Sequence, residues 1–133
     1  MRVRHGGSGS PILPLHGHPR THATWHRVAP LLATHHTAVC PDLRGYGQSS
    51  KPQDTPDHSG MSKRALAQNM ADLMHHLGHN QFAVVGHDRG SYVAFRLAMD
   101  HPAQVTRLAF LGYAPIVEAL ERVNERFAKA WWH

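Results

Sequence analysis

The chain has 133 residues, of which 41% are hydrophobic and 17% charged, a length and composition that predict one globular domain rather than a disordered segment. Its formal net charge is +5, but the 14 lysines and arginines are scattered and form no run typical of nucleic-acid binding. No apolar stretch reaches the roughly 18 residues that a membrane-spanning helix needs, and the first residues lack the apolar segment of a secretory signal. The single cysteine, Cys40, has no partner for an internal disulfide, so a cytoplasmic location is expected.

The first half of the chain predicts two short strands, one helix and a long loop. Residues 11–15 and 36–40 are apolar enough for strands. Between the two strands, residues 21–33 carry apolar side chains at helical spacing. Residues 43–60 are rich in Gly, Ser, Pro and Asp and are expected to form a loop.

The second half alternates helices and strands more clearly. Helices are expected at 61–77, 89–100 and 115–132, and strands at 82–86 and 105–111. This alternation is typical of the α/β class. We therefore expect a mostly parallel sheet of about four strands with helices on both faces.

The sharpest motif is Gly-His-Asp-Arg-Gly at residues 86–90, between a predicted strand and a predicted helix. Glycines two residues before and after a central residue allow a tight turn that presents this residue, here Asp88, beside a helix N-terminus. A carboxylate is ionised at neutral pH and suits attack on a saturated carbon that carries a leaving group. The resulting ester needs water and a general base for its hydrolysis. The alternative interpretation is that Asp88 only caps the following helix.

Two further motifs follow the first two predicted strands. In His-Gly-His-Pro at residues 16–19, the backbone N–H of His18 is placed to form an oxyanion hole together with the N–H of Arg89. The segment 42–49, Asp-Leu-Arg-Gly-Tyr-Gly-Gln-Ser, is interpreted as a structural loop braced by Asp42.

Histidine is unusually frequent, with 14 residues. His18, His22 and His26 are spaced by four, as are His75 and His79, and such spacing on a helix can present metal ligands on one face. No cysteine or carboxylate completes either set, so a compositional bias on solvated surfaces is the favoured interpretation. Neither a metal nor an organic cofactor is expected. Water would be the second substrate, because it hydrolyses the ester expected on Asp88.

Taken together, the order and spacing of these motifs resemble the α/β-hydrolase fold. The Gly-His-Asp-Arg-Gly motif is similar to that of haloacetate dehalogenases, including fluoroacetate dehalogenases, in the epoxide hydrolase-like superfamily, while aspartate at the nucleophile position separates the chain from serine hydrolases. The resemblance covers residues 6–133, and by this resemblance residues 6–9 look like the turn before the strand predicted at 11–15. It implies a partial hydrolase core at 1–113, the start of a cap or a terminal helix at 114–133, and the strand order second, first, third, fourth.

The resemblance also implies roles for individual residues. Asp88 is the nucleophile, Arg89 binds the substrate carboxylate, Tyr92 stands where a second arginine is usual, and His133 is placed to bind the leaving halide. Gly112 occupies the position of the acid that orients the family's catalytic histidine, and that histidine falls beyond residue 133.

Three functions stay open from the sequence. The first is a haloacetate dehalogenase, catalytically incomplete, in which Asp88 displaces halide from a small 2-halo acid. The second is a non-catalytic hydrolase-fold protein, and the third is an epoxide or ester hydrolase with the same turn. Because residues 105–111 would form a bare sheet edge, the chain is interpreted either as a truncated gene product or as one that completes itself by forming a homo-oligomer.

Overall fold

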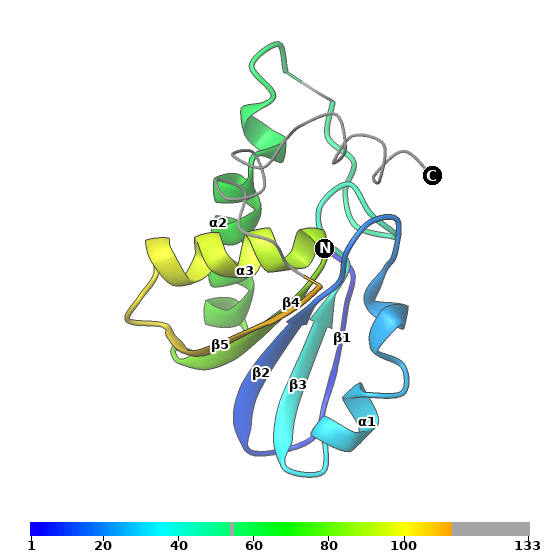
Figure 1. The fold of residues 1–133 in the computed structure, drawn as a ribbon, viewed down its shortest axis with the longest axis vertical. Coiled ribbons are helices and arrows are strands. Elements are labelled where there is room, and N and C mark those ends of the chain that lie inside the picture. The colour runs from blue at the N-terminus through cyan, green and yellow to red at the C-terminus, as the bar shows by residue number, and fades with distance from the viewer. Residues whose placement is uncertain (54, 113–133) are drawn as a thin grey trace, which may run out of the picture.

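The computed structural model describes residues 1–53 and 55–112. Five strands form one sheet in the order β1-β3-β2-β4-β5 (Figure 1). The parallel strands are β2 (Ser10–Leu15), β3 (His36–Pro41), β4 (Phe82–His87) and β5 (Val105–Leu111), and their predicted order is confirmed. The predicted count of about four strands is too low, because β1 (Val3–Gly6) pairs antiparallel with β3.

The glycine-rich turn between β1 and β2 is present where the sequence predicts it. It passes close to the start of β3, and an added Cβ would lie 2.2 Å from the His36 carbonyl oxygen at Gly7 and 2.4 Å from that of His35 at Gly9. Both glycines also have φ angles in the left-handed region, +88° and +117°. The turn therefore requires glycine at both positions.

Two long helices follow the predicted spans closely. Ser62 caps α2 (Lys63–His76) by accepting a hydrogen bond from the N–H of Ala65, and Gly78 follows the helix with a φ of +81°. The second, α3 (Arg89–Asp100), has the predicted bounds.

The predicted helix at 21–33 is wrong as a continuous element. The chain instead forms a short 3₁₀ helix, η1 (His22–Trp25), and one turn of α-helix, α1 (Ala29–Leu32). Pro30, the second residue of α1, has no N–H to donate to the carbonyl oxygen of His26, so η1 and α1 do not join into one continuous helix. A second 3₁₀ helix, η2 (Ser59–Met61), lies at the end of the predicted loop.

Helical segments cover both faces of the sheet, as expected (Figure 1). On one face, α2 and α3 pack against the central strands and form the core. This core includes Leu13, Leu15, Val39, Leu66, Met70, Met74, Phe82, Val84, Val93 and Leu97. On the other face, η1 and α1 lie over the side chains of Ala38 and Cys40.

The predicted helix at 115–132, the segment 114–133 and the halide-binding residue His133 lie outside the described residues. Within the described part of the chain, no helix has the length and apolar character needed to span a membrane.

Candidate active site

Asp88 lies at the tip of a sharp turn between β4 and α3. Its φ is +52°, in the left-handed region that side-chain-bearing residues rarely adopt. An added Cβ would lie 2.4 Å from Ser91 Cα at Gly86 and 2.4 Å from the Leu15 carbonyl oxygen at Gly90. Glycine is thus required on both sides of Asp88, and the turn has the geometry that its sequence predicts.

The turn after β2 lies directly against Asp88. Strands β2 and β4 are in register with Leu15 opposite Gly86, so their carboxyl ends reach the same level of the sheet. The backbone N–H of His18 donates a 2.8 Å hydrogen bond to Asp88 Oδ2. At Gly17, an added Cβ would lie 2.5 Å from both Cβ and Oδ2 of Asp88. This glycine allows the two turns to touch. The carboxylate makes no side-chain capping hydrogen bond within α3 beyond the Arg89 N–H, which favours its charged form.

The pKa of Asp88 lies below its ordinary value. Partial burial of the carboxyl raises the pKa, but the N–H groups of Arg89 and His18 and the charges of His87 and Arg89 outweigh this effect. The side chain is therefore a carboxylate at neutral pH, the form that a nucleophile needs.

Three further predicted site residues belong to the described part of the chain: Arg89, Tyr92 and Gly112. The Arg89 side chain is exposed and makes no hydrogen bond or ion pair within residues 1–53 and 55–112. Tyr92 is half-buried and lies one turn further along α3. Gly112 follows Leu111, whose carbonyl oxygen accepts a 3.0 Å hydrogen bond from the N–H of Asp88. The position at which the resemblance expects an acid is therefore beside the Asp88 turn, but glycine there carries no side chain.

Tyr46 is a site residue that the sequence does not single out. Its hydroxyl lies 3.3 Å from His18 Nδ1, and its ring meets those of His16 and His18 edge-on, with centroids 5.2 and 5.9 Å apart. The loop after β3 thus forms a third side of the site. Its only signal in the sequence is its place directly after the carboxyl end of a parallel strand.

Asp42 braces this loop, in agreement with its predicted structural role. The side chain is 1% exposed, and Oδ1 accepts the backbone N–H of His22 at 2.8 Å and lies 2.7 Å from its Nδ1. The other oxygen, Oδ2, accepts the N–H of Gln48 at 3.0 Å. An added Cβ at Gly47, where φ is +51°, would lie 2.1 Å from the same oxygen. The carboxylate therefore holds two separate segments in place.

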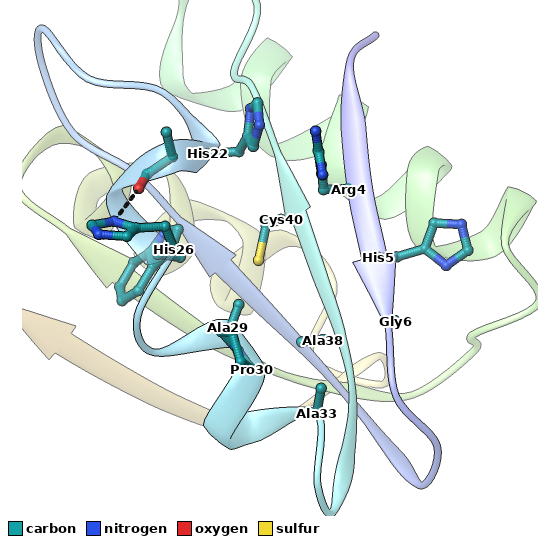
Figure 2. A pocket seen from close by; sticks show the side chains of 12 residues that line it. Arg4, His5, Gly6, His22, His26, Ala29, Pro30, Ala33, Ala38 and Cys40 are labelled. Atoms are coloured by element: carbon teal, nitrogen blue, oxygen red, sulfur yellow. Dashed lines mark hydrogen bonds between the residues drawn. The ribbon is translucent and has the colours of Figure 1, made fainter.

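A cavity of about 460 Å³ lies away from Asp88, between β1, β3 and the η1–α1 segment (Figure 2). Arg4 and His5 of β1, His26, and the small residues of α1 line it, and none of its lining residues belongs to the Asp88 turn. Cys40 lines the cavity from β3, and burial raises the pKa of its thiol to about 11. The cavity therefore contributes no group to the Asp88 turn.

The predicted spacing of histidines does not produce a ligand cluster. His22 is bound to Asp42, and the Nδ1 of His26 bonds the carbonyl oxygen of Ala23. In the part of the chain that the structure describes, no three His, Cys, Asp or Glu side chains gather as metal ligands.

Comparison with known proteins places this geometry in a family. The family model for the α/β-hydrolase fold matches residues 10–132. The chain is 50% identical over 128 residues to a fluoroacetate dehalogenase from Burkholderia sp., covering 96% of the chain and 42% of the relative. It is 42% identical over 109 residues to a soluble epoxide hydrolase from Corynebacterium sp. strain C12, covering 82% of the chain and 36% of the relative.

A solved structure gives the same result. A candidate α/β hydrolase from Nostoc sp. PCC 7120 superposes with a TM-score of 0.95 at 50% identity, covering 98% of this chain and 45% of that one. The chain thus spans less than half the length of these relatives. By its sequence and its fold, the chain belongs to the α/β-hydrolase fold family.

Proposed function

We propose that the chain is a hydrolase of the haloacetate dehalogenase type, in which Asp88 displaces halide from a small 2-halo acid. The observation that carries the proposal is the contact between the His18 N–H and Asp88 Oδ2 at 2.8 Å, on a carboxylate held at the tip of the turn. The similarity to a fluoroacetate dehalogenase supports the choice of substrate class.

The contact supports separate tasks for the two carboxylate oxygens in the proposed reaction. Because His18 binds Oδ2, the attack is assigned to Oδ1, which forms a bond to the substrate carbon while the halide leaves with the bonding electron pair. Oδ2 then becomes the carbonyl oxygen of the ester and keeps its N–H donor. When water adds to the Asp88 Cγ, negative charge develops on Oδ2, where the donor already points, so no reorganisation is needed.

Arg89 is the residue proposed to bind the substrate carboxylate. Its guanidinium follows the nucleophile directly and is exposed, so it is available to a small anion. Tyr92, one turn further along α3, supplies a hydroxyl where a second guanidinium would bind more tightly, so we expect weaker anion binding than an arginine pair would give.

Epoxide hydrolysis is the second candidate, supported by the similarity to a soluble epoxide hydrolase. The same carboxylate would open the ring, and the alkoxide formed would remain in the product as a hydroxyl group. A third alternative, a non-catalytic hydrolase-fold protein, is favoured by Gly112 at the position of the orienting acid.

The test is halide release per mole of chain from fluoro-, chloro- and bromoacetate, measured beside Asp88→Asn. We expect at least one equivalent of halide from the native chain and none from the variant. Equal halide release by Asp88→Asn would overturn the proposal. Diol formation from a small epoxide without any halide release would favour the second candidate, and neither product would favour the third.

A further inference from the structure

An ion pair between the two long helices shows how the first turn of α2 lies on α3. Arg64 Nε, in that turn, is 3.4 Å from Oδ2 of Asp100 at the end of α3, and α2 crosses α3 and packs against it (Figure 1). Positions 89, 92, 96 and 100 of α3 recur at helical spacing and share one face. The first turn of α2 therefore lies along the face of α3 that begins with Arg89.

Lys63 is the other basic residue of this turn, and its charge acts toward the start of α3. Its side chain is half-buried, and the charges of both Arg89 and Asp88 act on its ammonium group. Within the described part of the chain, neither Lys63 nor Arg89 forms an ion pair or a side-chain hydrogen bond. Two cations without a partner of their own therefore share the surroundings of the Asp88 carboxylate.

The position of Lys63 is unfavourable for a cation. It is the first residue of α2, at the positive end of the helix dipole, and the first turn contains no acidic residue. Burial and the charge of Arg89 lower the pKa of Lys63, against the charge of Asp88, which raises it. Asp100 offsets the charge of Arg64, but no carboxylate other than Asp88 acts on Lys63. An anion bound between Lys63 and Arg89 would balance these charges.

The reaction proposed for Asp88 brings such an anion. In a 2-halo acid the attacked carbon is bonded directly to the carboxylate carbon, so the attack places two negative charges close together. Arg89 alone offsets one of them. We propose that Lys63 is the second cation that binds the substrate carboxylate. The inference rests on the proposed function and deepens it by naming a residue that selects an anionic substrate.

Other groups near the turn do not supply this charge. Arg44 Nη1 donates a 3.0 Å hydrogen bond to the Gly60 carbonyl oxygen, and Arg64 is paired as described above. Tyr92 shares the α3 face with Arg89 but carries no charge. An ammonium lacks the paired donors of a guanidinium, so Lys63 should bind a carboxylate more weakly than a second arginine would.

The proposal also separates the two candidate reactions. A carboxylate gains from both Lys63 and Arg89, whereas an uncharged epoxide gains from neither charge. Discrimination between a charged and an uncharged reagent of the same shape is therefore the property that the Lys63 charge should control.

The first experiment measures anion binding without any chemical step. Asp88→Asn cannot be alkylated at this position and lacks the charge that repels an anion. Acetate is titrated into this variant at low ionic strength and followed by ¹⁵N chemical shifts, with acetamide as the uncharged probe. We expect saturable binding of acetate alone, weakened about tenfold by Lys63→Met and within about threefold of the starting affinity in Lys63→Arg.

The matched control is Arg64→Met, which removes the neighbouring positive charge from the same helical turn. Because Arg64 is directed to Asp100, this variant should retain the acetate affinity. Lys63→Met removes a half-buried cation from a helix start, so its free energy of unfolding in urea should not fall. Lost affinity with undiminished stability is a result that a purely structural lysine would not give. Lys63→Gln repeats the test with a polar side chain if methionine prevents folding.

The second experiment measures the same charge selectivity during the reaction. The chain with native Asp88 is treated with bromoacetate or bromoacetamide, and alkylation of Asp88 is quantified by peptide mapping. We expect Lys63→Met to lower the rate ratio of the two reagents about tenfold while the bromoacetamide rate stays within about twofold. Lys63→Arg should restore most of the ratio.

Each other outcome overturns a defined part of the argument. No acetate binding to Asp88→Asn, or equal affinity in Lys63→Met and Lys63→Gln, would overturn the role of Lys63. Equal losses in Lys63→Met and Arg64→Met would also overturn it, because the effect would then belong to the general positive field. Acetate binding that depends on Lys63, without alkylation of Asp88 in the native chain, would overturn the proposed function and leave the anion site in place.

Discussion

The backbone N–H of Asp88 donates a 3.0 Å hydrogen bond to the carbonyl oxygen of Leu111, the last residue of β5. The Asp88 turn is therefore held by β5 on one side, while its carboxylate is bound by the His18 N–H on the other. The left-handed φ of Asp88 is maintained by both neighbours, since neither contact survives a large rotation of the turn.

The tight contact at Gly90 predicts that one added methyl group lowers the stability of the fold. In Gly90→Ala, the new Cβ would meet the carbonyl oxygens of Leu15 and His16 at 2.4 and 2.6 Å. Both are backbone atoms at the carboxyl end of β2, one in its last residue and one directly after it, and they cannot move freely, so we expect a loss of about 1–3 kcal/mol in the free energy of unfolding. Urea-induced unfolding followed by circular dichroism measures this loss.

The matched control for this substitution is Gly60→Ala. The nearest atom to its added Cβ is Arg44 Nη1 at 3.8 Å, an ordinary contact. We expect a change within about 0.5 kcal/mol. Equal losses in the two variants would contradict the packing argument.

The buried carboxylate of Asp42 predicts a stability that depends on pH. Burial raises its pKa, but the N–H groups of His22 and Gln48 and the His22 side chain outweigh burial, so the pKa in the folded state lies below the ordinary value of 3.8. A group of this kind stabilises the fold above its unfolded pKa, and the contribution is lost as the pH falls through the folded pKa. Asp42→Asn removes the charge and leaves an N–H donor facing an NH₂ group, with an expected cost of about 3 kcal/mol at neutral pH.

Unfolding in urea at a series of pH values from 7 to 3 checks this expectation. The difference between the native chain and Asp42→Asn should shrink as the solution becomes acidic. A difference that stays constant over the series would show that the carboxylate's charge is not what stabilises the loop.

Cys40 is predicted to be inert in the folded chain. Burial raises the pKa of its thiol to about 11 from 9.0, so the thiolate fraction at pH 8 falls about 100-fold relative to the unfolded chain. Labelling with iodoacetamide should be slow in buffer and fast in urea. Rapid labelling of the folded chain would contradict the burial of this residue, and it would also require Cys40→Ala as the background for the bromoacetate experiments.

In the part of the chain that the structure describes, β5 is an edge strand, and its apolar side chains predict self-association. Leu108, Phe110 and Leu111 are 36%, 38% and 45% exposed on this strand, and nearby α3 adds Phe95 and Met99 at 44% and 60%. An apolar edge strand pairs readily with another chain, so we expect the apparent mass to rise with concentration in light scattering coupled to size exclusion. Leu108→Lys should lower this apparent mass, and a monomer at every concentration would contradict the prediction.

Much of the fold could be predicted, because short-range sequence patterns in the second half of the chain identify its helices and strands. The apolar run of β4, the glycines around Asp88 and the spacing in α3 are all short-range signals. The first strand could not be predicted, because its four residues are Val-Arg-His-Gly and only pairing with β3 makes them a strand. Pro30 did signal the break in the predicted helix, but the helical spacing of its neighbours outweighed it.

Only those site residues that belong to a motif with a defined turn geometry could be predicted from the sequence. Asp88 and the His18 N–H follow from their turns, and the structure places them in contact. The roles of Tyr46 and of the His22–Asp42 pair depend on which loops meet in space, and no local pattern encodes that meeting. Arg89, Tyr92 and the nucleophile's chemistry stay predictions, and His133 lies outside the described residues.

The pairing of β2 with β4 also has a consequence for folding kinetics. His18 and Asp88 are 70 residues apart in sequence, and they meet only when these two strands align. Closing so long a loop carries a large entropic cost and is slow compared with the formation of α2 or α3. The contact between the His18 N–H and the Asp88 carboxylate is therefore expected to form late in folding, after α2 and α3.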